Sequence, residues 1–408
     1  MIKFFKDKIV NHFSLIILVL GAVCFLFTNI MLKERLDRKE YGEYSIWITY
    51  LSMMYIYGLL GIEQVFVRYS HLIRTNTFET QKIQLNLIFG AMIFTSVTGS
   101  LFFYFNYGEV EVNFLVLLVT TFCMVVLLFF FSVFRLNSSF IFAQLIPNIY
   151  KFALFALTLF LFFLYEVKWD IIKYGIAISI MGTFLCGLFF YKKNLRFEYV
   201  KGHPNNIIFV SAVYFLISTT SFSLVSFADR YIIEHKFGIE KLGDYFYLTN
   251  LFLAPFSILQ NYVGFRQLIT YKSNFSTEVF LKNNRKVLMF GLAISLVLFA
   301  GSKIINQLNM VNFNFGEYDF TIVLLLIFGV VKLYNSDINA AFDVRTNIVN
   351  LKKANIINLL VAVLILILAS LLAQSMEQII ILIILIWILR ATVLKSLLLN
   401  QEKIQSVE

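Results

Sequence analysis

The stretch RKEYGEYSIW, residues 38–47, lies between two long apolar runs, and residues 240–248, EKLGDYFYL, repeat much of it. Gly-Glu-Tyr at 42–44 aligns with Gly-Asp-Tyr at 243–245, and each copy leads into an apolar run. A match this short either arises by chance or marks an internal repeat, in which two parts of the chain share one plan. The repeated phrase therefore suggests that the chain consists of two similar halves.

The composition identifies the chain as an integral membrane protein. Of its 408 residues, 60% are hydrophobic and 14% are charged, whereas soluble domains contain roughly 45–50% apolar and about 25% charged residues. The net charge of +10 does not indicate nucleic-acid binding, because Lys and Arg lie mainly in short loops between apolar runs, as in cytoplasmic loops of membrane proteins. Three dispersed cysteines and four scattered histidines predict no disulfide framework, no metal site and no cofactor.

About twelve runs have the roughly 20 mostly apolar residues that a spanning helix needs. Because backbone polar groups cannot stay unpaired in lipid, we expect each run to be a helix. The first run follows the basic start MIKFFKDK, but it is too long for a signal peptide and no cleavage site follows it. The predicted spans are 12–32, 44–66, 84–105, 113–134, 140–164, 171–190, 207–229, 244–265, 286–307, 319–341, 355–373 and 378–399.

The distribution of Lys and Arg predicts the orientation. With the N-terminus in the cytoplasm, inside segments carry about 21 Lys and Arg and outside segments about 10, so both termini are expected to be cytoplasmic. Six predicted spans separate the two copies of the repeated phrase, which places them on the same face of the membrane. We therefore predict an all-α protein of two parallel six-helix lobes, residues 1–195 and 207–408, joined by a cytoplasmic linker at 196–206.

Three cations lie near the middle of predicted spans: Lys151, Lys332 and Arg390. A charge in the bilayer core costs about 2.5–3.5 kcal/mol on insertion scales, so each of them requires a reason. One explanation is a misplaced span boundary, which would let the side chain reach the headgroups. The other is a site inside the protein, and three such residues together favour it.

Polar residues accompany these cations at helical spacing. Asn148 precedes Lys151 by one turn, beside Pro147, which would free backbone groups. In the tenth span a stripe runs through Lys332 and Asn339. Such a stripe faces a cavity, although hydrogen bonds that merely hold helices together are the alternative. Trp387 lies one turn from Arg390 and could form a cation–π contact with it.

Two carboxylates stand near the ends of predicted spans with an Arg close by. Glu63 precedes Arg68 on the inner side, and Asp229 is adjacent to Arg230 on the outer side. Each pair is either part of a gate or a local ion pair that lowers the free-energy cost of burying the charges and has no further function.

The basic interior of the predicted bundle suggests an anionic cargo, because phosphate and pyrophosphate form charge-assisted hydrogen bonds with Lys and Arg. The sequence has no Walker-type glycine loop and no HExxH motif, so no ATP site or metalloprotease site is expected. A membrane polymerase or glycosyltransferase would need catalytic residues in a substantial loop outside the membrane, and the connections here are short.

Two stretches carry a resemblance to a known family. One is LDRKEYGEYSIWITYLSMMYIYGLLGIEQVFVRY at 36–69, and the other is SFADRYIIEHKFGIEKLGDYFYLTNLF at 226–252. Together with the plan of two six-helix lobes, they resemble the O-antigen type polysaccharide flippases of the multidrug/oligosaccharidyl-lipid/polysaccharide exporter superfamily. The residues that match are Tyr41, Gly42, Tyr44, Gly61, Arg68, Tyr69, Asp229, Gly238, Gly243 and Tyr245.

The resemblance implies a V-shaped transporter of the bacterial inner membrane that works by alternating access. Its cargo would be an undecaprenyl-pyrophosphate-linked oligosaccharide, moved from the cytoplasmic to the periplasmic leaflet for lipopolysaccharide biosynthesis. Membrane lipid, a polysaccharide polymerase and a chain-length regulator are the implied partners, and nucleic acid is not. Some drug-exporting relatives carry an acid in the first helix, where this chain has only Thr28 and Asn29.

Two alternatives to a flippase remain open at this point. A cation-coupled small-molecule exporter of the same fold would bind its cargo without a lipid carrier and would need an essential buried acid. A membrane-embedded polysaccharide polymerase would need a catalytic constellation on the outer face, which the sequence does not show.

Overall fold

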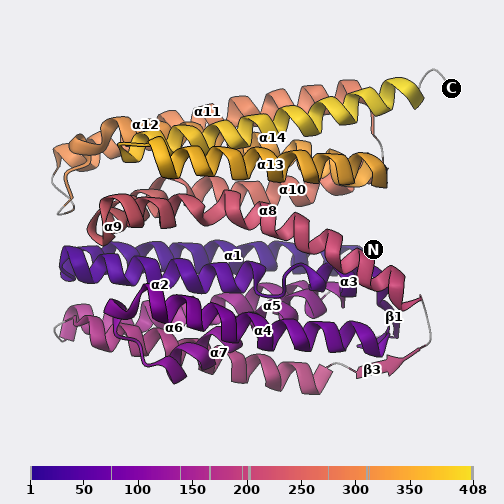
Figure 1. Ribbon diagram of the computed structural model, residues 1–408, viewed down its shortest axis with the longest axis horizontal. Helices are drawn as coiled ribbons and strands as arrows, with labels where there is room; N and C mark the ends of the chain where they lie inside the picture. The colour runs from indigo at the N-terminus through magenta and orange to yellow at the C-terminus, as the bar shows by residue number, and fades with distance from the viewer. Residues whose placement is uncertain are drawn as a thin grey trace. The chain divides into compact units, whose positions relative to one another are not determined.

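The computed structural model describes residues 2–405 except 75, 138, 165–166, 195, 201–203, 274, 309–310 and 312. Helices account for most of these residues (Figure 1). The chain divides into two compact units, Met1–Ser223 and Leu224–Glu408. The boundary lies inside a continuous helix, so each unit is described here with its own part of that helix.

The N-terminal unit contains seven α-helices and the beginning of an eighth, together with three short strands and a 3₁₀ turn at Gly108–Val110. Among its helices, α1 packs most extensively on α6. The helices are α1 (Ile2–Arg35), α2 (Arg38–Tyr57), α3 (Ile62–Tyr69), α4 (Lys82–Asn106), α5 (Phe114–Leu136), α6 (Phe140–Leu164), α7 (Trp169–Asn194) and the first part of α8 (Asn205–Phe237); the strands are β1 (His71–Arg74), β2 (Thr77–Thr80) and β3 (Arg196–Tyr199).

The C-terminal unit contains the rest of α8, six further α-helices and a 3₁₀ turn at Phe315–Tyr318. The helices are α9 (Ile239–Phe252), α10 (Ala254–Ser273), α11 (Thr277–Gln307), α12 (Asp319–Arg345), α13 (Ile348–Leu372) and α14 (Met376–Gln405). α12 packs against α10, α11 and α14. Of the residues in its 18-residue apolar stretch, 72% are buried within the protein, the highest share for any span found in the described chain. α12 is therefore the central helix of this unit.

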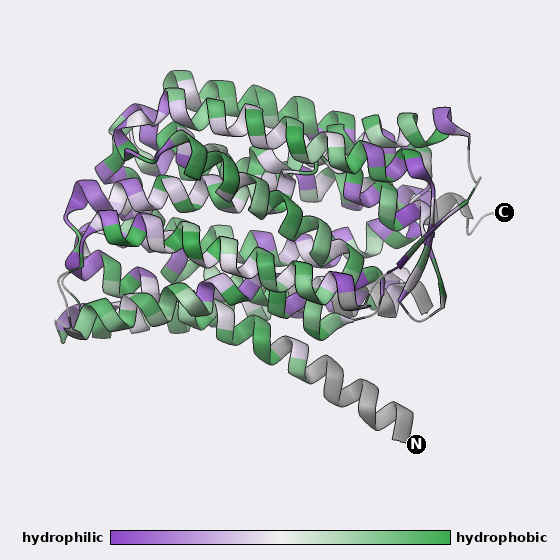
Figure 2. Ribbon diagram, turned by 90° about the horizontal axis from the view of Figure 1, so that it is seen from below, coloured by the Kyte–Doolittle hydropathy of each residue, from purple (hydrophilic) through white to green (hydrophobic). Residues whose placement is uncertain are grey.

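Eleven helical segments of the described chain are long and apolar enough to cross a membrane, and they correspond to eleven of the twelve predicted spans. The remaining predicted span, 244–265, is divided between α9 and α10 at Leu253. Figure 2 shows apolar residues concentrated along the helices and polar residues gathered at many of the helix ends and connections. The predicted all-α membrane architecture is confirmed.

The first copy of the repeated phrase begins a helix because its sequence supplies a capping box. The carboxylate of Asp37 accepts a hydrogen bond from the backbone N–H of Glu40 at 2.7 Å. The side chain of Glu40 accepts one from the N–H of Asp37 at 3.3 Å. Two N–H groups that the first turn would leave unpaired are thereby satisfied. The second copy starts α9 directly after Gly238, which has φ +86°.

The second span of the N-terminal unit is interrupted. α2 ends at Tyr57 and α3 begins at Ile62, and between them Leu60 and Gly61 both have positive φ, 55° and 79°. A Cβ at Gly61 would lie 2.7 Å from the carbonyl oxygen of Phe215 on α8. Glycine is required here both for the left-handed backbone and for the close approach of α8.

A three-stranded sheet in the order β1-β2-β3 lies beyond one end of the helices of this unit (Figure 1). β1 and β2 are antiparallel neighbours, whereas β2 and β3 pair in parallel, from Thr77 with Arg196 to Thr80 with Tyr199. Phe78 and Phe197 stack with their ring centroids 5.7 Å apart, and Phe66 of α3 packs on both rings. The sheet thus fixes the chain that leaves α7. The predicted linker at 196–206 contains β3, and the predicted lobe boundaries stay predictions.

Candidate functional site

The residues that the sequence singles out fall into both units. Asn148, Lys151, Glu63 and Arg68 belong to the N-terminal unit, and a larger set belongs to the C-terminal unit. That set consists of Asp229, Arg230, Lys332, Asn339 and Arg390.

In the N-terminal unit, α6 presents a polar pair at helical spacing. The ammonium of Lys151 donates to Oδ1 of Asn148 at 3.0 Å. The amide nitrogen of Asn148 donates to the carbonyl of Gln144 at 2.7 Å, and Asn148 is only 1% exposed. The nitrogen of the Asn148 amide is thus held by Gln144, and its oxygen is directed toward Lys151. α6 continues through Pro147 without a break.

The place of Asn148 depends on a glycine in α1. A Cβ at Gly21 would lie 2.2 Å from Oδ1 and 2.9 Å from Cβ of Asn148. The absence of a side chain at Gly21 thus allows α1 and α6, the most closely packed helix pair of this unit, to enclose the amide.

The substitution Gly21→Ala is expected to lower the free energy of unfolding by about 1–3 kcal/mol, the usual cost of overpacking a filled interior. Because the new methyl group displaces Asn148, transport should fall together with stability. Thermal unfolding of the purified protein measures the first effect. Gly182→Ala is the matched control, since nothing lies within 4 Å of the added Cβ. Equal stability of Gly21→Ala and wild type would contradict the packing argument.

Glu63 and Arg68 lie on α3, just after the interruption of the second span. Glu63 is 5% exposed and accepts a long hydrogen bond from Gln64 at 3.4 Å, whereas Arg68 is exposed and lies over the ring of Tyr69. No ion pair joins Glu63 and Arg68 in the described part of the chain.

In the C-terminal unit, the predicted cations meet at one indole ring. Lys332 of α12 and Arg390 of α14 lie 5.4 Å and 5.8 Å from the ring of Trp387. Arg390 also donates to Oδ1 of Asn339 at 3.5 Å. The amide of Asn335 joins the two helices by donating to the carbonyl of Trp387 at 3.1 Å. Residues of α12 and α14 that contact one another across 51 to 55 positions of sequence thus form a single cluster, which we call the Trp387 cluster: Lys332, Asn335, Asn339, Trp387 and Arg390.

The predicted pair on α8 lies close to the same cluster. Asp229 is 5% exposed and accepts a hydrogen bond from the hydroxyl of Tyr245 at 2.5 Å, and its other oxygen has no hydrogen-bond partner among the described residues. Asp229 and Arg230 lie close enough to Lys332 for their charges to act on its ammonium group. The side chain of Arg230 lies over the rings of Phe227 and Phe246. The Tyr of the repeated phrase at 245 therefore orients a buried carboxylate near Lys332.

A second buried carboxylate, Asp337, escaped the sequence interpretation. It is fully buried on α12 and accepts from the hydroxyl of Tyr271 at 2.9 Å and from the amide of Asn284 at 3.1 Å. Asp337 follows Lys332 by five positions, so helical periodicity places it about 140° from the stripe through Lys332 and Asn339. A carboxylate inside an apolar span is nevertheless a sufficient signal by itself.

The Trp387 cluster can hold an anion. Two cations converge on one ring from different helices, and α12 is shielded from lipid by its neighbours. Guanidinium and ammonium groups in such surroundings form strong hydrogen bonds with phosphate oxygens. Within the described residues, no group of three or more His, Cys, Asp or Glu could hold a metal ion.

Comparison with known proteins gives a fold but no sequence family. No family model and no curated protein matches the chain. An outward-facing multidrug resistance MATE family transporter of the MOP superfamily superposes with a TM-score of 0.62 at 14% identity, over 96% of each chain. The lipid II flippase MurJ, in an inward closed conformation, superposes with a TM-score of 0.64 at 14% identity, over 94% of this chain and 86% of its own.

A third similar structure is a MOP superfamily transporter from Pyrococcus furiosus, described as having a binding pocket of reversed polarity, with a TM-score of 0.55 at 11% identity over 96% of each chain. At these identities the similarity concerns the fold. The chain therefore has the fold of MOP superfamily transporters, the multidrug/oligosaccharidyl-lipid/polysaccharide group that its sequence resembles, and it is a multi-pass membrane protein.

Proposed function

We propose that the chain is a flippase for undecaprenyl-pyrophosphate-linked oligosaccharide repeat units of the O-antigen type. It moves them by alternating access from the cytoplasmic to the periplasmic leaflet of a bacterial inner membrane, with both of its own termini in the cytoplasm. Like the similar structures, which are transporters and flippases, it performs no chemical conversion of its cargo.

The Trp387 cluster is the observation that carries this proposal. Lys332 and Arg390 lie within apolar helices, where an unused charge costs about 2.5–3.5 kcal/mol. A pyrophosphate group would compensate that cost through charge-assisted hydrogen bonds, bidentate in the case of Arg.

In this proposal Lys151 and Asn148 of α6 supply a second polar contact to the cargo, and Asn339 supplements Arg390. Glu63, Arg68, Asp229 and Arg230 act in gating, since each lies on a helix that borders an interruption or on α8 near the Trp387 cluster. A lipid-linked cargo is supported by the similarity to MurJ, a flippase for lipid II.

The first helix supports the same choice. Thr28 and Asn29 are fully buried, and their side chains donate to carbonyls of their own helix, Cys24 at 2.9 Å and Phe25 at 2.6 Å. Neutral groups that are already paired within α1 offer no exchangeable charge to a coupling cation. Export driven by a cation at this position is therefore disfavoured.

The test is made in cells. The gene is deleted in its host, and the leaflet that holds the undecaprenyl-pyrophosphate-linked repeat units is determined together with surface polysaccharide. Repeat units confined to the cytoplasmic leaflet, without surface polysaccharide, are the expected result. Unpolymerised single units on the periplasmic side would instead indicate an assembly enzyme and would overturn the proposal.

A second candidate function is a cation-coupled small-molecule exporter, which requires a buried acid. Asp337 and Asp229 are such acids in the C-terminal unit, and MATE family multidrug resistance transporters share the fold. The two functions differ in their cargo. Binding of a soluble cationic compound to the purified protein, together with normal surface polysaccharide in the deletion strain, would select the exporter.

A further inference from the structure

α11 is an outer helix of the C-terminal unit. Only 11% of the residues in its 18-residue apolar stretch are buried within the protein, compared with 72% for its neighbour α12. The buried residues of its first half, Phe280, Asn284, Val287 and Gly291, recur every three or four positions and form one face, which packs toward α12. The opposite face of α11 is exposed at the surface of the unit.

The length of α11 places its first turns among the lipid headgroups. It has 31 residues, or about 46 Å at 1.5 Å per residue, whereas the hydrocarbon core is about 30 Å thick. One charged residue, Lys303, lies near the other end of α11, and the other four lie in its first ten positions, on the side that the Lys and Arg distribution predicts to be cytoplasmic. They therefore lie at the depth of phosphate groups.

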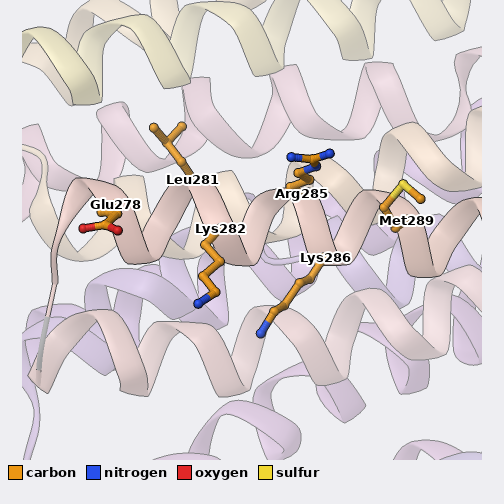
Figure 3. A pocket seen from close by; sticks show the side chains of 6 residues that line it. All are labelled: Glu278, Leu281, Lys282, Arg285, Lys286 and Met289. Carbon is orange, nitrogen blue, oxygen red and sulfur yellow. The ribbon is translucent and has the colours of Figure 1, made fainter.

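Three basic side chains gather on the outward face of these turns. Lys282, Arg285 and Lys286 are all exposed, and none of them forms an ion pair with another described residue, although Glu278 lies one turn from Lys282. With Glu278, Leu281 and Met289 they line a hollow of about 600 Å³. In Figure 3 all six side chains come from this one helix; Lys282 and Lys286 point to one side of it and Arg285 to the other, so the three flank the outward face. We call these three basic residues the α11 basic face.

The same side of the helix becomes apolar immediately beyond these charges. Met289 is 60% exposed, Leu292 45% and Leu296 73%, at a spacing of three or four residues that continues the outward face. A ligand along this face would meet positive charge at one end and an apolar track on the other. That order matches an amphiphile whose charged end lies at the membrane surface.

We propose that the α11 basic face binds the headgroup of an anionic phospholipid, with the acyl chains along Met289, Leu292 and Leu296. A phosphodiester oxygen accepts hydrogen bonds from Lys and Arg, and basic pockets beside membrane helices on the cytoplasmic side are known to bind anionic headgroups. The positive end of the helix dipole adds to the attraction. This binding does not depend on the proposed cargo.

The experiment compares lipid binding to the purified full chain by native mass spectrometry, with phosphatidylglycerol and phosphatidylcholine as probes. The triple variant Lys282→Gln, Arg285→Gln, Lys286→Gln should bind phosphatidylglycerol about a hundredfold more weakly, since each basic residue near an anionic surface contributes roughly fivefold. The matched control is Lys82→Gln, Arg135→Gln, Lys192→Gln, which removes the same charges from exposed positions on α4, α5 and α7. It should retain wild-type affinity.

Four outcomes would overturn the proposal. One is an equal loss of affinity in the control, and another is equal binding of the two lipids to the wild type. Displacement of the lipid by glycerol 1-phosphate alone would mean a site for free phosphate. Displacement by farnesyl pyrophosphate at lower concentration than by phosphatidylglycerol would mean a site for the polyprenyl carrier.

Discussion

Replacing Lys332 and Arg390 together with alanine is expected to lower transport of the lipid-linked cargo by at least about a hundredfold. Each charged hydrogen bond to a phosphate contributes about 1.5–3 kcal/mol, and both cations belong to the Trp387 cluster. Surface polysaccharide in a deletion strain that carries the variant measures the effect. The exchange variant Lys332→Arg, Arg390→Lys keeps both charges and should restore part of the activity.

The control for this variant is Lys82→Ala, Arg135→Ala, which removes one Lys and one Arg from exposed positions and should leave transport unchanged. Membrane insertion and thermal stability of both variants are measured in parallel, because the two cations also contact the ring of Trp387. A wild-type amount of surface polysaccharide in the Lys332→Ala, Arg390→Ala strain would show that the Trp387 cluster takes no part in transport.

Replacing Asp337 with alanine is expected to destabilise the C-terminal unit by about 3–5 kcal/mol. The substitution leaves the hydroxyl of Tyr271 and the amide of Asn284 without an acceptor, and each buried group without a partner costs about 1–3 kcal/mol in addition to the cavity. In a unit of this size, such a loss lowers the melting temperature by roughly 10 °C. Thermal unfolding at a fixed scan rate provides the measurement.

A swap of the two polar partners separates hydrogen bonding from charge. Asp337→Asn alone brings two amide nitrogens together, because Asn284 already donates to this position. The double variant Asp337→Asn, Asn284→Asp restores one donor and one acceptor and keeps an acceptor for Tyr271, so it should regain most of the lost stability. A double variant that is stable but inactive would assign Asp337 to ion coupling and would favour the small-molecule exporter.

The helices could be predicted from the sequence because apolar length is a direct physical requirement of the bilayer. Ten of the twelve apolar runs coincide with single helices, and the runs 44–66 and 244–265 are each divided between two helices. The apolar pattern does not predict the break inside the eighth run, at Leu253, although Pro255 lies two residues beyond it and offers no N–H to the preceding turn. The strands were missed as well, since β2 pairs with β3 more than a hundred residues away and four residues carry no periodicity.

The candidate site was predictable in its charges and not in its contacts. Lys332 and Arg390 attract attention because any charge in an apolar run does. That they share the ring of Trp387 follows only from the packing of α12 on α14. Asp337 could have been found by the same signal, whereas its contacts could not, because Tyr271 and Asn284 lie on two other helices and follow from no helical pattern of the sequence.

α8 passes from one compact unit into the other without interruption, and its first part completes the N-terminal unit. Ile208 and Ala212 pack against Val65 in a buried cluster, and Ser211 shares a hydrogen bond with Tyr69 at 2.8 Å. A gene divided at the connection before α8 would thus give a first fragment that lacks part of its own interior. Such a fragment would lose the buried contact of Val65 and the hydrogen bond of Tyr69.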